Sequence, residues 1–208
     1  MKPILFLAVV SATMAGCATD INRKNAPIYY DAGLRAEASQ NWPAAKEAYR
    51  RSLINARSGG RSPALVSAAT YNLGRMTGYT CDYAEAEALL QEATTLEQGL
   101  PSPDPGNLTK RWSELARLYQ DQGRDQEAAA LYGRAVSELE RLDVVGQDPV
   151  GFANYLDDYA NALTGAGQPV LARTVAARAA TLRAEHAGQV AKFVPLRFEA
   201  ACARFKSS

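Results

Sequence analysis

The chain has 208 residues with 23 basic and 22 acidic side chains, so its formal net charge at pH 7 is +1. Lys and Arg do not cluster, which excludes a stripe that follows nucleic-acid phosphates and a polybasic patch for a membrane surface. The single histidine, His186, excludes a catalytic triad and a two-histidine metal site. We therefore expect no enzyme activity, no metal, no cofactor and no nucleic-acid partner.

The first residues carry the pattern of an export signal. A short basic start, Met1-Lys2, precedes an apolar run over residues 4–10 and a small, weakly polar stretch over residues 11–16. The apolar run is too short for a permanent membrane-spanning helix, which needs about twenty apolar residues. This pattern predicts an exported protein without a transmembrane helix.

Residues 14–17, Met-Ala-Gly-Cys, resemble the lipobox of bacterial lipoproteins, although the first lipobox position is usually Leu. The resemblance implies that residues 1–16 are a signal peptide and that Cys17 becomes the lipidated N-terminus. Two or three acyl chains on its thiol and its new amine would anchor the protein stably, whereas a single chain does not. The alternative is an ordinary secretory signal, which would leave Cys17 as a free thiol.

Residues 17–25 are expected to form a lipidated tether. After the cysteine they are polar and lack periodicity, as in a short flexible linker, and fully extended they reach roughly 30 Å. Ala18 stands where enterobacterial lipoproteins retained in the inner membrane carry Asp. By that resemblance we expect a protein of the cell envelope, anchored by lipid in the outer membrane and facing the periplasm.

Four small residues are each followed, twelve positions later, by an alanine. The pairs are Gly33 and Ala45, Gly74 and Ala86, Ala116 and Ala128, and Ala160 and Ala172, and successive units are 41, 42 and 44 residues apart. A fixed interior with variable connections is typical of supersecondary units that stack on their neighbours. It favours a binding scaffold over a pocketed enzyme.

Prolines indicate where the first helices of units two to four begin. Ser62-Pro63, Asp104-Pro105 and Asp148-Pro149 each place an N-cap residue before a proline of the first helical turn. The second helices of the four units are predicted to begin near Trp42, Asp82, Arg124 and Gln168.

The third unit carries the fullest pattern: Trp112, Leu115, Ala116, Tyr119, Gly123, Ala128, Tyr132 and Ala135. It closely resembles a tetratricopeptide (TPR) repeat, in which two antiparallel helices cross at small residues. Its length is similar to that of the long repeats of kinesin light chains. The resemblance implies an all-α, right-handed α-solenoid over residues 26–187, with four units near residues 26–58, 62–100, 104–142 and 148–187.

The same resemblance implies a peptide-binding groove on the concave face of the first helices. Its candidate residues are Tyr71, Asn72, Arg75 and Tyr79 of unit two, Lys110, Ser113 and Arg117 of unit three, and Asn154, Asp157 and Asn161 of unit four. Asn72 is expected to bind a peptide backbone, and Arg75 and Arg117 are expected to bind its carboxylates. The alternative for each residue is an ordinary solvated helix face.

Two functions fit these predictions. The first is a membrane-anchored adaptor or scaffold that holds partner proteins of the bacterial cell envelope near the membrane. The second is a fixed structural or pilotin-like subunit of a secretion, pilus or cell-wall complex.

The last part of the chain, residues 188–208, is too apolar for a free tail. Phe198, Ala201, Cys202 and Phe205 recur with helical spacing, so we expect a helix that caps the last repeat. The alternative is a segment that docks in the solenoid's own groove or on a partner. Cys81 lies two units away from a capping helix, beyond the roughly 7 Å limit for a disulfide, so we expect two buried thiols. Only a tail folded back along the groove would allow Cys81 and Cys202 to pair.

Overall fold

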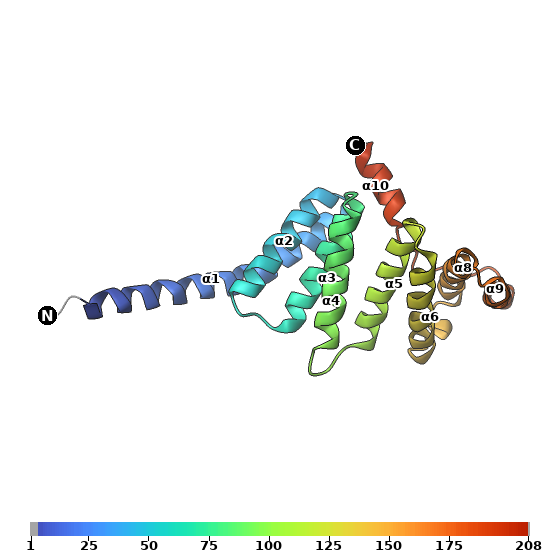
Figure 1. Ribbon diagram of the computed structural model, residues 1–208, viewed down its shortest axis with the longest axis horizontal. Helices are drawn as coiled ribbons and strands as arrows, with labels where there is room; N and C mark the ends of the chain where they lie inside the picture. Colours follow the sequence, from blue (N-terminus) through green and yellow to red (C-terminus); the bar gives the residue numbers. More distant parts are fainter. Residues whose placement is uncertain (1–3, 208) are drawn as a thin grey trace.

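The computed structural model describes the backbone of residues 4–207 and the side chains of residues 18–207. Within this part of the chain the protein has helices and no strands, as Figure 1 shows. The helices are α1 (Ile4–Ala38), α2 (Trp42–Ser58), α3 (Pro63–Tyr79), α4 (Tyr83–Gln98), α5 (Pro105–Asp121), α6 (Asp125–Arg141), α7 (Val144–Gln147), α8 (Pro149–Gly165), α9 (Pro169–Glu185) and α10 (Phe198–Lys206).

Four antiparallel hairpins, α1/α2, α3/α4, α5/α6 and α8/α9, stack in chain order. Local sequence explains where they begin. The side chains of Asn41, Asp82, Asp104 and Asp148 each accept a hydrogen bond from the backbone N–H three residues further on. Proline opens α3, α5 and α8, as the sequence predicted, but Ser62 makes no capping hydrogen bond through its side chain.

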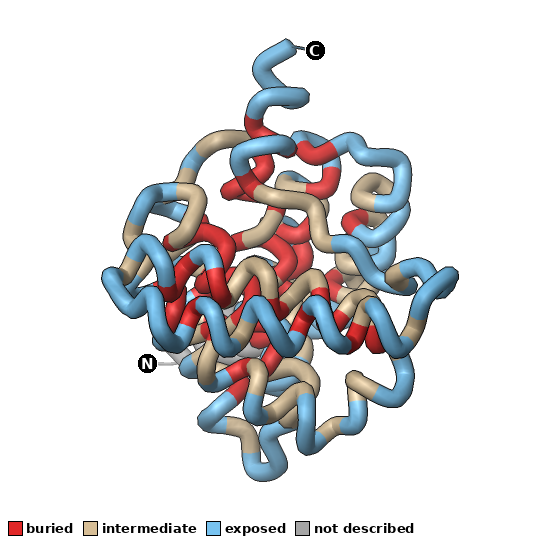
Figure 2. The backbone as a smooth tube through the Cα atoms, turned by 90° about the vertical axis from the view of Figure 1, so that its right-hand side faces the viewer, coloured by how far each residue is buried: buried red, intermediate tan, exposed pale blue. Residues whose placement is uncertain are grey.

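The small residues of the twelve-residue pairs lie where the two helices of each hairpin cross. Ala45, Ala116 and Ala128 are fully buried. A Cβ atom on Gly33 would lie 2.5 Å from Cε1 of Tyr49, so only glycine allows this approach. The hairpins pack through a main core and a second, smaller cluster between α8 and α9, both of which contribute to the buried segments in Figure 2.

The prediction that residues 17–25 form a flexible tether is wrong about their conformation. Residues 18–25 belong to α1, which continues without a break into the first repeat (Figure 1). Arg23 Nε donates to the carbonyl oxygen of Gly59 at 3.2 Å, and Ser52 Oγ donates to the carbonyl oxygen of Ala26 at 2.8 Å. These contacts with α2 and its C-terminal turn extend the helix beyond the range that sequence periodicity indicated.

The lipobox prediction stays untested. Met1-Lys2 lie outside the described residues, and residues 14–17 belong to α1 with side chains outside the described ones. Across the described residues, none of the helices combines the length and the apolar content that crossing a bilayer requires.

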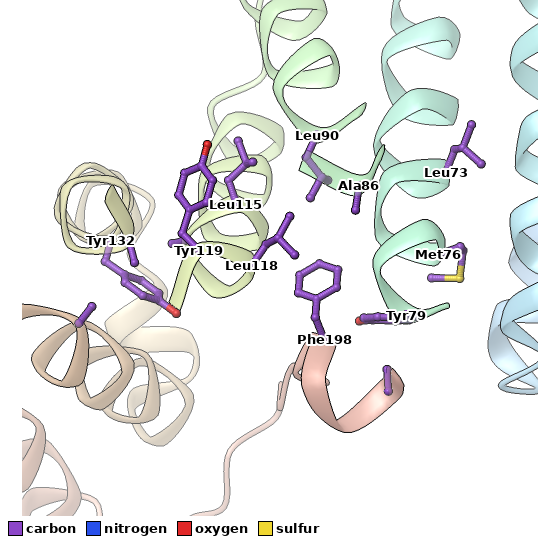
Figure 3. Close-up of a cluster of buried hydrophobic side chains, with 14 of the residues drawn as sticks. Leu73, Met76, Tyr79, Ala86, Leu90, Leu115, Leu118, Tyr119, Tyr132 and Phe198 are labelled. Atoms are coloured by element: carbon purple, nitrogen blue, oxygen red, sulfur yellow. The ribbon is translucent and has the colours of Figure 1, made fainter. Parts of the chain in front are cut away.

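The expected position of the C-terminal helix is wrong as well. After α9 the chain turns back over the stack, and α10 packs against α3 and α5 instead of capping α9. Figure 3 shows the ring of Phe198 between Tyr79 of α3 and Leu118 of α5. Phe198 is fully buried and its ring centroid lies 5.3 Å from that of Tyr79. Gly78 makes room for it, because a Cβ atom there would overlap the Phe198 ring.

This return path also overturns the expectation of two buried thiols. Cys81 and Cys202 form a disulfide with a Cα–Cα distance of 5.0 Å. The distance argument assumed that Cys202 followed the last repeat outward. The bond becomes possible because α10 lies beside the turn between α3 and α4.

Candidate functional site

A cavity of about 610 Å³ lies on the side of the stack formed by the first helices of the hairpins. Its lining comes from the first helices α1, α3, α5 and α8, from the α6–α7 region and from the C-terminal segment. The lining residues are Glu37, Tyr71, Arg75, Gly106, Thr109, Lys110, Ser113, Glu114, Arg117, Leu139, Leu142, Val144, Asp148, Gly151, Phe152, Asn154, Tyr155, Asp158, Phe193 and Pro195.

The centre of the charged end is the carboxylate of Glu114 on α5. Arg117 Nη2 lies 2.9 Å from Glu114 Oε1, and Arg75 Nε lies 3.5 Å from the same oxygen. Arg75 also reaches Glu37 on α1, with 2.7 Å between Nη1 and Oε1. These ion pairs connect the first helices of units one, two and three.

Both arginines keep their charge despite burial. Burial acts to lower the pKa of Arg117, but the Glu114 carboxylate together with Tyr132 and Tyr155 outweighs it, so the pKa is raised. The balance is the same for Arg75, whose pKa is also raised mainly by Glu114. The charged end therefore holds permanent cations at any physiological pH.

Six of the ten predicted groove residues line this cavity: Tyr71, Arg75, Lys110, Ser113, Arg117 and Asn154. Lys110 is exposed at the rim. Ser113 and Tyr155 share a hydrogen bond of 2.8 Å between their hydroxyl oxygens. The side chain of Arg117 is 3% exposed, so it belongs to the floor of the cavity and not to an open helix face.

The other four predicted residues have different roles. Asn72 is buried and its Nδ2 donates to the hydroxyl of Tyr30 at 2.9 Å, which ties unit two to unit one. The hydroxyl of Tyr79 donates to the carbonyl oxygen of Leu196 at 3.3 Å, under the C-terminal segment. Asp157 forms an ion pair with Arg183 of α9, and Asn161 is exposed outside the cavity.

Sequence reasoning missed the apolar end of the cavity. This end consists of Leu139 and Leu142, Val144 of the short helix α7, and Phe152 of α8. Part of it lies in the linker between units three and four, where repeat patterns carry no information. The 44-residue spacing of those units, the longest of the three, was the available signal.

The C-terminal segment, residues 188–198, is held across the cavity at both ends. The backbone N–H groups of Lys192 and Phe193 each donate to Asp148 Oδ2 at 3.1 Å. Arg197 forms ion pairs with Asp121 and Asp158. The disulfide fixes α10 immediately beyond this segment.

The network at Asp148 has an electrostatic consequence. Partial burial acts to raise the pKa of Asp148, but the N–H groups of Gly151, Lys192 and Phe193 outweigh it, so the pKa is lowered. The charged carboxylate is thus the form that holds the segment.

Among the residues whose side chains are described, no three His, Cys, Asp or Glu side chains gather as a metal site would require. A buried ion pair elsewhere in the stack, Arg111 with Glu97 at 2.9 Å, connects α5 to α4 and is fully enclosed. This ion pair joins two helices of the repeat stack, and neither of its residues lines the cavity.

The stack of hairpins has the architecture of TPR-like solenoids, which confirms the predicted fold class. The structure of BtubC (BKLC) from P. vanneervenii matches with a TM-score of 0.70 and 20% sequence identity, over 83% of this chain and 67% of that chain. A single-residue variant of a Podosopora anserina kinesin light chain with nearly identical TPR-like repeats gives 0.63 and 20%, over 91% and 86%. MamA gives 0.61 and 15%, over 84% and 88%.

At these identities the similarity establishes the fold alone. The sequence matches no protein-family model and no curated protein.

Proposed function

We propose that this protein is a non-catalytic adaptor of the bacterial cell envelope, which binds a partner protein on the concave side of its solenoid. The observation that carries the proposal is an exposed apolar surface on the C-terminal segment. Val190 is 82% exposed, Phe193 66% and Val194 73%. Phe193 and Val194 lie on the stretch between the contacts of Lys192 and Phe193 with Asp148 and the ion pairs of Arg197, and Val190 lies just before it.

Fixed apolar side chains differ from those of a free tail. Since the segment is held by Asp148 at one end and by Arg197 and the disulfide at the other, its exposed side chains are already ordered before any partner arrives. Ordering is a main cost of binding, and contiguous exposed apolar surface commonly indicates a protein contact. The partner would contact this segment and the nearby rim at Lys110.

Site-specific photo-crosslinking in cells tests this assignment. A photoreactive amino acid at Val194 should capture the partner, and the same group at Arg173, exposed on α9 outside the cavity, is the matched control. Identical products from both positions, or none from Val194, would reject the concave side as the interface. If the captured protein always belongs to one complex of fixed stoichiometry, this would favour the fixed structural subunit over an adaptor with exchangeable partners.

The membrane anchor is a separate part of the proposal. It is supported by the resemblance of residues 14–17 to a lipobox, and α1 would lead from Cys17 directly into the repeats. We expect Cys17→Ser to lose labelling by a clickable fatty acid. Label retained on that variant would remove the lipoprotein assignment, and fractionation with the inner membrane would contradict the outer-membrane expectation.

A further inference from the structure

Within the C-terminal segment, the stretch from Lys192 to Phe198 lies on the first helices of the repeats as a bound peptide would. It contains no helix before Phe198, and repeat side chains hold its backbone. Asp148, the N-cap of α8, accepts hydrogen bonds from two successive N–H groups, and the hydroxyl of Tyr79 on α3 donates to the carbonyl oxygen of Leu196. The stretch belongs to no hairpin of the stack, so these side chains form a site for a peptide without helical structure.

Two successive side chains of the stretch make the specific contacts. Arg197 Nε donates to Asp121 Oδ1 of α5 at 2.9 Å, and Arg197 Nη1 lies 3.3 Å from Asp158 Oδ1 of α8. The next residue, Phe198, is fully buried against Gly78, where a Cβ atom would overlap its ring. These contacts select a basic residue that is followed directly by an aromatic one.

The charge of the groove favours a basic occupant. The side chain of Asp121 is 2% exposed and is paired with Arg197. Burial raises the pKa of Asp158, and Arg197 acts to lower it. Removal of the stretch would therefore leave both carboxylates without this cation, beside a cavity lining that is already net negative. That lining holds four carboxylates, Glu37, Glu114, Asp148 and Asp158, and three cations, Arg75, Lys110 and Arg117.

The disulfide fixes the chain just beyond these contacts, and its cysteine in the repeats stands at an unusual position. Cys81 occupies the turn position at which units three and four carry Gly123 and Gly167, and the three residues have φ values of 73°, 71° and 73°. Glycine adopts this left-handed conformation readily, whereas a residue with a Cβ atom is strained in it. The bond to Cys202 gives a cysteine at this position a role, because it joins α10 to the turn between α3 and α4.

We propose that the groove beneath residues 192–198 is a binding site for an extended partner peptide with a basic residue followed by an aromatic one, and that the disulfide keeps the chain's own segment in this site. After reduction the segment is held by noncovalent contacts alone, so a peptide of the same chemistry competes with it. The site does not depend on the partner protein proposed above, which contacts the outer surface of the segment while the segment is in place.

Opening the bond requires a dithiol reductant. Cys81 is partly exposed, whereas Cys202 is buried, so a thiolate of the dithiol attacks Sγ of Cys81. Cys202 leaves as a thiolate and takes up a proton. The second thiol of the dithiol then attacks the mixed disulfide, so the reductant departs as a disulfide and Cys81 becomes a thiol. Two electrons and two protons pass to the protein.

Fluorescence anisotropy with a synthetic peptide tests the site. The labelled probe is residues 189–206 with Cys202→Ser. The receptor is the full chain with Cys17→Ser and Cys202→Ser, together with Arg197→Glu, which repels its own segment from Asp121 and Asp158. We expect one probe to bind per receptor, at least tenfold more tightly than to the oxidised Cys17→Ser chain. Absence of binding to a receptor with the circular dichroism of the parent, or equal binding to the oxidised chain, would overturn the proposal.

A second comparison covers a receptor that does not fold. The Cys17→Ser chain should bind the probe after treatment with dithiothreitol and not before it. No gain of binding on reduction would overturn the proposal in that case. Because the assay contains no cellular partner, its outcome is separate from that of the crosslinking experiment on the partner protein.

Matched variants locate the bound probe. In the peptide, Arg197→Glu should weaken binding at least tenfold, whereas the same charge reversal at the exposed end of α10, Lys206→Glu, should leave it unchanged. In the receptor, Asp121→Asn should weaken binding at least tenfold, whereas Glu185→Gln, exposed on α9 outside the cavity, should not. Equal effects of the two peptide changes would indicate nonspecific charge attraction and would refute the site.

Discussion

Loss of the disulfide between Cys81 and Cys202 should strongly destabilise the protein. The bond joins residues 121 positions apart, so it restricts most of the unfolded chain. Loop-closure entropy for a loop of about this length is worth roughly 5 kcal/mol at 25 °C, whereas measured native disulfides typically contribute about 2–4 kcal/mol. We therefore expect Cys202→Ser to lower the free energy of unfolding by about 2 to 5 kcal/mol.

Urea denaturation followed by circular dichroism measures this change, in a Cys17→Ser background that removes the third thiol. Cys81→Ser should be as destabilising as Cys202→Ser, and the double variant should be no worse than either, because a single bond is lost in all three. Dithiothreitol should bring the parent chain to the same midpoint. A midpoint in Cys202→Ser equal to that of the oxidised parent would refute the reasoning.

Three further outcomes follow from the packing. Ala116→Leu adds three heavy atoms at a fully buried helix crossing and should cost about 1–3 kcal/mol or more, seen as a lower melting temperature, and an unchanged melt would remove Ala116 from the crossing. Glu97→Gln leaves the buried cation of Arg111 uncompensated and should cost about 3–5 kcal/mol, whereas a cost near zero by denaturant titration would contradict its pairing. Asp148 has a lowered pKa in the folded state, so its stabilisation is present above its unfolded pKa, near 4, and is lost as the pH falls through the lower folded value. Hydrogen exchange should accordingly lose protection at the Lys192 and Phe193 amides on acidification and in Asp148→Ala at pH 7, and full protection in that variant would refute the anchor.

The repeat architecture was readable from the chain because its determinants are local. Ala116 and Ala128 stand twelve positions apart on the two helices of one hairpin, and both are fully buried, as their spacing predicted. Helix starts at Asp104 and Asp148 depend on the next three residues, and these caps formed as the sequence indicated.

The candidate site was readable only in part. First-helix register placed Tyr71 with Ser113 and Arg75 with Arg117 on one lining, because residues at equivalent repeat positions share a face. Register does not tell whether a polar side chain finds a partner inside the protein. Asn72 was expected to bind a ligand, and it bonds to Tyr30 of the preceding repeat instead.

What the sequence by itself determined is therefore the repeated unit, its register and its stacking, which follow from contacts between residues close in the chain or one repeat apart. Tertiary structure alone decided the path of residues 188–207, the pairing of Cys81 with Cys202, and the cavity with its apolar end. The path of this segment and its disulfide depend on where Phe198 can bury its ring. Room for the ring exists only after α3 and α5 have stacked, and only because Gly78 of α3 has no side chain to fill it. A contact between residues more than a hundred positions apart produces no regular spacing in the sequence. The distance between two such residues depends on how every helix between them packs.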